Sequence, residues 1–192
     1  HRLGFVRMQQ GLFAQACASF RNYRAIQRPH GTSEEILSTD ANYAEAAIYS
    51  EYYSVLNVID KTIVYESFAG QSMSCSPYAL FLYMFNHPDY QDWTHIWVIN
   101  DPAKIPEEYK CYKNVIFVAR GSDVYLRYLA TAKVLLNNSN FPPCFIRKPE
   151  QKYLSAWHGT PFKTLGRDME GRFFEHKNLP RNIFQATHLL SP

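Results

Sequence analysis

Short apolar segments alternate with segments of helical spacing along most of the chain, and this alternation limits the fold more than any other feature of the sequence. Where apolar residues recur every three to four positions we expect a helix, and where a short apolar run stands between turn residues we expect a strand. The expected helices are 42–58, 77–86 and 123–132, and the expected strands are 62–68, 95–100, 114–119, 133–137 and 152–157. Short strands that alternate with helices form a parallel sheet wrapped on both faces. The sequence therefore predicts an α/β fold whose ligands bind at the carboxyl ends of the strands.

The first 40 residues have a different pattern. Gly4, Gly11, Ala16 and Phe20 recur at spacings that place them on the facing sides of two short antiparallel helices. This pattern resembles the end of a tetratricopeptide repeat, in which small residues let the helices approach and Phe20 fills the gap between them. An ordinary helical hairpin that caps the next domain is the alternative. Residues 29–40 are rich in Gly, Ser, Thr and acidic residues and are interpreted as a linker.

Two domains follow from this change of pattern. Residues 1–40 are predicted to form the tetratricopeptide-like (TPR-like) helical hairpin and linker, through which a protein partner could bind, and residues 41–192 the α/β domain. The chain begins with His1 and stops directly after a motif, so we expect it to be a piece of a longer polypeptide.

The composition excludes several classes of function. A balance of 20 Lys and Arg against 17 Asp and Glu is only mildly basic, so we expect no nucleic-acid partner. The longest apolar runs are far short of the roughly 20 residues that span a bilayer, and any membrane contact would be peripheral. An aromatic share of 16% indicates a heavily packed interior or aromatic binding surfaces.

The four cysteines are scattered, without a Cys-x-x-Cys pair or a His spaced to complete a zinc site. They are Cys17, Cys75, Cys111 and Cys144. We interpret them as reduced thiols, and we predict a cytoplasmic protein without a metal site.

One predicted strand runs directly into His158-Gly159-Thr160-Pro161 and then into a predicted helix. Gly159 lets the backbone turn, Thr160 can cap the helix, and Pro161 suits the first helical position. The first N–H groups of such a helix attract phosphate, and Lys163 adds a positive charge one turn later. His158 could accept a proton from a hydroxyl. A structural histidine that bonds across the turn explains the spacing equally well.

Four ordered motifs resemble those of one enzyme family. The run from Trp157 to Pro161, followed by Lys163, Leu165, Gly166 and Asp168, resembles the Trp-His-Gly-Thr-Pro-x-Lys-x-Leu-Gly-x-Asp run of the CDP-glycerol glycerophosphotransferase family, which builds teichoic acids and related capsule polymers. Three further stretches match that family in the expected order, namely 65–72 with 76–77, 128–133 and 181–192. The resemblance covers the chain from about residue 60 to its end.

The resemblance implies a fold and a set of roles. The family has two Rossmann-like halves that face each other across a cleft (the GT-B arrangement), and this chain corresponds to the N-terminal half, which supplies the acceptor side and the His base. His158 would be the catalytic base, and Asp168, with Glu66 as the weaker candidate, could orient it or bind an acceptor. The residues that would bind phosphate or substrate are Gly159, Thr160, Lys163 and Asp168. Neither a metal nor a cofactor is implied.

The loop that follows the first predicted strand is a second candidate site. Gly70 bends the chain there, so the Ser72 hydroxyl and the nearby backbone N–H groups could face the cleft and bind substrate or phosphate. A plain strand-to-helix turn is at least as compatible with the residues. The chain also departs from the family here, because the family often has Gly where Ala69 stands and Asp or Asn near Cys75 or Ser76.

The resemblance also predicts a reaction. His158 deprotonates the terminal hydroxyl of a growing polymer, the oxygen attacks the β-phosphate of CDP-glycerol, and CMP leaves. CDP-ribitol or another nucleotide-linked donor is an alternative, and so is a non-catalytic scaffold or polymer-binding module. We expect the enzyme to lie at the inner face of the cell membrane, in peripheral contact, and residues 1–192 alone to be inactive.

Overall fold

The structure is a computed structural model that describes residues 2–10, 12, 15–16, 18–19, 22, 41–157, 159 and 178–190. The chain divides into two compact units, His1–Asn57 with Pro143–Phe145 and Val58–Pro142 with Ile146–Pro192. The predicted TPR-like hairpin and the linker after it fall largely outside the described residues, and both stay predictions, as does the boundary between 1–40 and 41–192.

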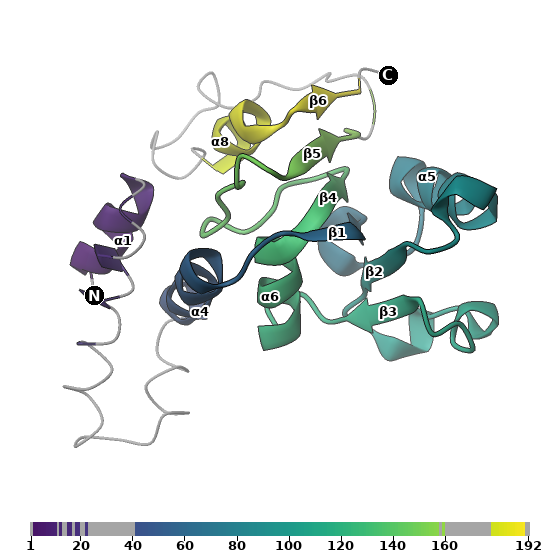
Figure 1. Cartoon of the computed structure of the whole chain (residues 1–192), viewed down its shortest axis with the longest axis horizontal. Coiled ribbons are helices and arrows are strands. Elements are labelled where there is room, and N and C mark those ends of the chain that lie inside the picture. The colour runs from purple at the N-terminus through teal and green to yellow at the C-terminus, as the bar shows by residue number, and fades with distance from the viewer. Residues whose placement is uncertain are drawn as a thin grey trace. The chain divides into compact units, whose positions relative to one another are not determined.

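The first unit contains two described helices, α1 (Arg2–Gln9) and α4 (Ala41–Val55), which Figure 1 labels. Tyr49 of α4 is fully buried and packs edge-on against Phe145, with ring centroids 6.4 Å apart. The helix predicted at 42–58 is thus present, and it ends three residues early.

The second unit is built on a six-stranded sheet in which every neighbouring pair is parallel (Figure 1). Its strands are β1 (Ile59–Glu66), β2 (Thr94–Val98), β3 (Val115–Val118), β4 (Ala132–Asn137), β5 (Lys152–Ser155) and β6 (His188–Leu189). The spatial order is β3-β2-β1-β4-β5-β6, which is that of the doubly wound dinucleotide-binding folds. The predicted parallel α/β sheet is confirmed.

Two strands differ from the sequence-based expectation. β1 begins at Ile59 rather than at residue 62, and its register against β4 shifts between Ile59 and Ile63. Lys61 has a positive φ of 54° in this stretch, so the irregular backbone hides the start of the strand from an alternation pattern. β6 has only two residues and was not predicted.

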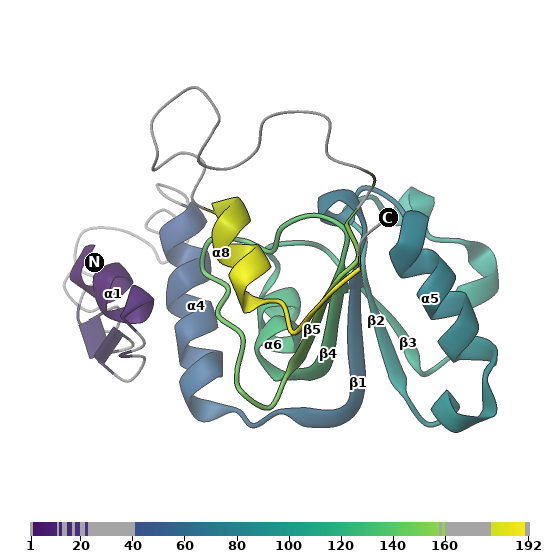
Figure 2. The ribbon, with the colours of Figure 1, turned by 90° about the horizontal axis from the view of Figure 1, so that it is seen from above.

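Helices cover both faces of the sheet. α5 (Cys75–Asn86) connects β1 to β2 on one face, whereas α6 (Asp123–Thr131) and α8 (Asn178–Gln185) lie on the other (Figure 2). Between β2 and β3 the described chain forms only the short 3-10 helices η4 (Pro102–Lys104) and η5 (Glu107–Tyr109).

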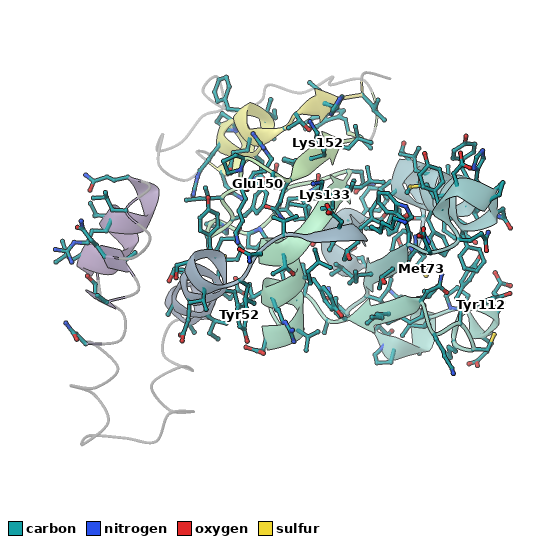
Figure 3. The ribbon with its side chains drawn as sticks, viewed as in Figure 1. Tyr52, Met73, Tyr112, Lys133, Glu150 and Lys152 are labelled. Atoms are coloured by element: carbon teal, nitrogen blue, oxygen red, sulfur yellow. The ribbon has the colours of Figure 1, made fainter. Side chains whose placement is uncertain are left out.

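The core between the sheet and α5 is aromatic. Tyr65 stacks on Trp97 with centroids 5.1 Å apart, and Phe81 of α5 meets the Trp97 ring edge-on at 5.6 Å. His95 is fully buried beside them, with Nδ1 2.9 Å from the Tyr65 hydroxyl, and burial lowers the pKa of His95 to about 4. Met73 packs on the same cluster (Figure 3). The aromatic residues of this unit therefore serve mainly as packing.

No helix in the described part of the chain is long and apolar enough to cross a membrane. The described cysteines Cys75, Cys111 and Cys144 form no disulfide with one another. Within the same ranges, His, Cys, Asp and Glu do not gather in a group of three or more that could hold a metal ion.

Candidate functional site

The strand order reverses between β1 and β4, which makes their carboxyl ends the switch point of the sheet. Glu66, the last residue of β1, is directly in register with Asn137, the last residue of β4. In open parallel sheets the chains leave in opposite directions at such a point and form a crevice for ligands. The loops that follow these two strands are therefore the place to look for function.

The loop after β1 has an unusual backbone. Phe68 and Ala69 have φ values of 48° and 55°, and Gly70 follows at 80°. A non-glycine residue in this region costs roughly 1–2 kcal/mol, so the surrounding structure must hold it. The loop after β4 supplies that support, because Phe68 N donates to Asn138 Oδ1 (2.8 Å) and Ala69 N donates to Ser139 Oγ (3.3 Å). The two loops thus brace each other across the switch point.

The positive φ values fall at two places where the sequence is expected to depart from the family's residues. Ala69 stands where the family often has Gly, and Cys75, near which it has Asp or Asn, has a φ of 62°. Gly, Asn and Asp are the residues that adopt this conformation most readily. Ala69 and Cys75 therefore adopt a backbone conformation that Gly, Asn and Asp adopt more readily.

Gly70 lies against Asn100, the second residue after β2. A side chain on Gly70 would place its Cβ 2.9 Å from Asn100 Oδ1. Asn100 joins three loops, because its backbone N and its Nδ2 donate to the carbonyls of Gly70 and Ala69, each at 2.9 Å, and its Oδ1 accepts from Arg120 N at 3.1 Å. The Ser72 hydroxyl is 2.7 Å from that of Ser74. The ligand roles predicted for Gly70 and Ser72 stay predictions.

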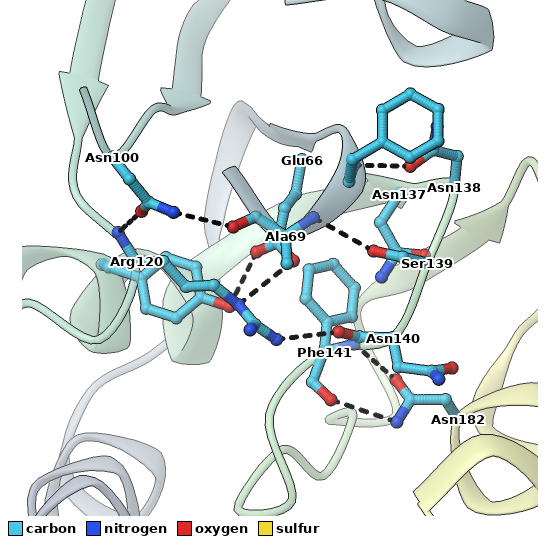
Figure 4. Close-up of polar contacts among 12 residues, drawn as sticks. Glu66, Ala69, Asn100, Arg120, Asn137, Asn138, Ser139, Asn140, Phe141 and Asn182 are labelled. Atoms are coloured by element: carbon cyan, nitrogen blue, oxygen red, sulfur yellow. Dashed lines mark hydrogen bonds and ion pairs between the residues drawn. The ribbon is translucent and has the colours of Figure 1, made fainter. Parts of the chain in front are cut away.

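A buried carboxylate lies beside this loop (Figure 4). Glu66 is fully buried, the Tyr125 hydroxyl donates to its Oε2 (2.9 Å), and Arg120 Nε is 3.4 Å from its Oε1. The same guanidinium donates through Nη2 to the carbonyl of Asn140 (2.9 Å). Burial raises the pKa of Glu66 to about 7, although the Arg120 charge and the Tyr125 hydrogen bond oppose the rise.

Several buried polar atoms in this cluster have no hydrogen-bond partner among the described residues. They include Glu66 Oε1, Asn137 Nδ2 and Asn140 Oδ1. Asn137 is held from its other side, where the Tyr153 hydroxyl donates to Asn137 Oδ1 (3.0 Å). Buried polar groups are rarely left unpaired, so an ordered water, a ligand or a group from outside the described residues is expected to pair with these atoms.

The predicted catalytic motif begins where β5 ends. Trp157 has a φ of 49°, which is a strained conformation for a bulky residue, and Gly159 is exposed with a φ of 134°. A Cβ on Gly159 would touch nothing within 4 Å, so the backbone angle rather than lack of space favours glycine there. The predicted site residues His158, Thr160, Lys163 and Asp168 lie outside the described residues, and their roles stay predictions.

A model of the CDP-Glycerol:Poly(glycerophosphate) glycerophosphotransferase family matches residues 48–192. The chain belongs to this family. Among curated relatives, the teichoic acid poly(glycerol phosphate) polymerase of Bacillus spizizenii W23 is 35% identical over 64% of this chain and 31% of its own length. The teichoic acid glycerol-phosphate transferase of Staphylococcus aureus NCTC 8325 is 31% identical over 70% of this chain and 33% of its own length. The chain thus spans about a third of these relatives.

The wall teichoic acid polymerase TagF has a similar fold. It aligns with a TM-score of 0.64 and 29% identity over 78% of this chain and 38% of TagF. A TagF variant soaked with CDPG aligns with a TM-score of 0.68 and 28% identity over 83% of this chain and 39% of that one.

The structure assigns contacts to one of the family motifs, the stretch 181–192. Asn182 of α8 accepts from Phe141 N (2.9 Å) and donates to Phe141 O (3.2 Å). Gln185 accepts from Arg147 N through Oε1 (2.7 Å) and from Arg147 Nε through its carbonyl (2.8 Å). These two side chains fasten α8 to the segment between β4 and β5.

Sequence reasoning missed several residues at the carboxyl edge, above all Asn100, Arg120 and Asn138. A signal was present, because the polar run 137–140 directly follows a predicted strand and Asn100 ends another. Glu66 was considered as a partner of His158, and in the described structure it contacts Arg120 and Tyr125.

Proposed function

We propose that this chain is the acceptor-side, N-terminal half of a GT-B glycerophosphotransferase, which transfers glycerol phosphate from CDP-glycerol to the terminal hydroxyl of a growing teichoic-acid-like polymer. Membership of the family supports the donor and the reaction. The six-stranded doubly wound sheet, aligned with about 38% of TagF, supports the assignment to one half of a two-half enzyme.

One observation carries the proposal: β5, which directly precedes the predicted His158 motif in the sequence, ends at the edge where the loops of β1 and β4 meet. β5 pairs with β4 in parallel, with Ser155 in register with Asn137, so the chain leaves β5 at the carboxyl edge. The strained Trp157 turns the backbone there. In the proposal, the acceptor hydroxyl is held at this edge, and His158, which follows Trp157 in the chain, acts on it there.

In the proposed reaction His158 takes the proton of the acceptor hydroxyl as its oxygen attacks the β-phosphorus of CDP-glycerol. A new P–O bond forms to the acceptor, the bond between the β-phosphorus and the bridging oxygen breaks, and CMP leaves with that oxygen. The predicted helix start from Gly159 to Lys163 would stabilise the charge on the transferring phosphate, and Asp168 would orient the base or bind the acceptor. No step requires covalent attachment to the enzyme.

The test measures products of the intact protein. CDP-glycerol and a short glycerol-phosphate acceptor should yield CMP and an acceptor that gains one glycerol phosphate in each catalytic cycle. Replacement of CDP-glycerol by CDP-ribitol separates the two polyol donors. Absence of both products with either donor, from folded protein, would remove the proposal and favour a polymer-binding module.

Two wider assignments belong to this proposal. The enzyme would lie at the inner face of the cell membrane, where its polymer grows, in peripheral contact. The N-terminal TPR-like helices would bind a protein partner. Sedimentation with vesicles, and cross-linking with residues 1–40 present and deleted, test these assignments separately.

A further inference from the structure

Arg120 is held at the carboxyl edge of the sheet by three different loops. Its backbone N donates to Asn100 Oδ1 after β2, its Nη2 donates to the carbonyl of Asn140 after β4, and its Nε faces Glu66 Oε1 at the end of β1. A long side chain normally samples many rotamers, so contacts at both its base and its tip fix its direction. The guanidinium is therefore set in place before any ligand arrives.

A buried glutamate costs more desolvation free energy than a residue with a purely structural role would need to cost. Its carboxylate is fully buried, while the Arg120 side chain is 30% exposed. Burying a charged group costs more free energy than a neutral amide of the same shape, which could also accept from Tyr125. A charged carboxylate beside Arg120 is consistent with an arginine that is oriented to bind an anion.

The chemistry of the surroundings points to phosphate. A guanidinium offers a planar set of donors that matches phosphate oxygens, and a fixed one loses little entropy on binding. Asn137 Nδ2, a further buried donor in the same cluster, has no partner among the described residues. A substrate that carries a phosphate in every unit would supply an acceptor for Asn137 Nδ2 as well as an anion for the guanidinium.

We propose that Arg120 forms a phosphate-binding subsite at the switch point, with Glu66 as its positioning residue, and that it contacts a phosphodiester of the polymer acceptor. The assignment rests on the proposed function, which places the acceptor on this half. The pyrophosphate of CDP-glycerol has the same chemistry, so the two sources are separated by experiment.

Phosphate binding at Arg120 is coupled to a proton. An anion beside the pair partly neutralises the positive charge of Arg120, which otherwise stabilises the Glu66 carboxylate, and it also repels that carboxylate directly. Both effects raise the pKa of Glu66 above its value of about 7 in the free site. Among the described residues, the other ionisable groups that face Glu66 are Arg120, Tyr125 of α6 and Tyr153 of β5. Arginine and tyrosine side chains ordinarily titrate far above neutral pH.

Steady-state kinetics of the intact protein test the subsite. Arg120→Ala should raise the KM for a glycerol-phosphate acceptor about 10- to 100-fold, the loss expected for charge-assisted hydrogen bonds, and leave the KM for CDP-glycerol within about twofold. Arg120→Lys should lie between. The matched control is Arg127→Ala, which removes the same charge from an exposed position on α6 and should change neither KM.

Three outcomes of the kinetics decide the matter. A rise in the acceptor KM supports the proposal. A rise confined to CDP-glycerol overturns the acceptor assignment, and unchanged values for both substrates in folded Arg120→Ala overturn the subsite itself. An active wild type with unaffected Arg120 variants leaves the proposed function intact, whereas an inactive wild type removes that function first.

The number of protons taken up when the acceptor binds provides a second measurement. A purely structural role of Glu66 would not change this number, and the measurement remains informative if Arg120→Ala fails to fold. The acceptor oligomer is titrated calorimetrically at pH 7 in two buffers of different ionisation enthalpy. Wild-type protein should take up as much as about half a proton more than Glu66→Gln, since a group with a pKa near 7 is half protonated at that pH. Equal uptake by the two proteins would overturn the coupling and the positioning role of Glu66.

Discussion

Two buried groups give the stability of this chain opposite dependences on pH. His95 has a folded-state pKa of about 4 against an ordinary value of 6.5, so the unfolded chain binds more protons between those values and stability is lost as pH falls from 6.5 to 4. Glu66 has a folded-state pKa of about 7 against an ordinary 4.5, so the folded chain binds more protons and stability is lost as pH rises from 4.5 to 7.

The two effects overlap between pH 4.5 and 6.5, where they nearly cancel. The full slope is about 1.4 kcal/mol per pH unit for each group, and it weakens at the edges of the window where a pKa lies, so the two units correspond to about 2 kcal/mol in each direction. Glu66→Gln removes the Glu66 contribution, so its free energy of unfolding should rise by about 2 kcal/mol relative to that of wild type as the pH rises from 4.5 to 6.5. His95→Asn, which keeps a polar atom near Nδ1 for the Tyr65 hydroxyl, should lose about as much over the same range.

Urea unfolding at four pH values, followed by tryptophan fluorescence, measures these differences because Trp97 is fully buried. Only the difference between variant and wild type matters, since all other titrating groups are common to the three proteins. If the three stability curves run parallel between pH 4.5 and 6.5, the burial argument for both groups is refuted.

Other predictions concern backbone strain and the anchor of α8. Ala69→Gly should raise the free energy of unfolding by up to about 1 kcal/mol, because its φ of 55° suits glycine, while Ala103→Gly in η4 should not stabilise. Asn182→Ala should lower it by about 2–3 kcal/mol, because the buried N–H of Phe141 loses its acceptor. The control Asn86→Ala removes only an exposed hydrogen bond to Leu82 O and should cost under about 1 kcal/mol. Urea unfolding tests all four, and equal effects within either pair would contradict the reasoning.

The sequence predicted the layered part of the fold because that part depends on local patterns. Strands β2 to β5 and helices α5 and α6 bury apolar residues at regular spacing, and each lies within a few residues of its predicted place. The two-residue β6 is held by pairing with β5 and by Thr187, whose Oγ1 accepts from Tyr153 N (2.9 Å), so its own residues carry little signal.

The polar cluster at the carboxyl edge depended on contacts that no local pattern encodes. Glu66 and Tyr125 are 59 positions apart, and Phe68 and Asn138 are 70 positions apart. Such pairs arise only when the strand order brings β1, β3 and β4 to the same edge. Sequence motifs could indicate Gly70 and Ser72 as candidates, but they could not identify Asn100 as the residue against which Gly70 packs.

The central claim is that His158 is the base of a CDP-glycerol-dependent transfer at this edge. Its most direct test is the single-turnover rate of glycerol phosphate transfer by the intact protein with saturating donor and acceptor. His158→Ala should lower that rate about 10²- to 10⁴-fold, while His87→Ala, a histidine at the C-terminal end of α5, should leave it unchanged. Transfer by folded His158→Ala at the wild-type rate would contradict the account.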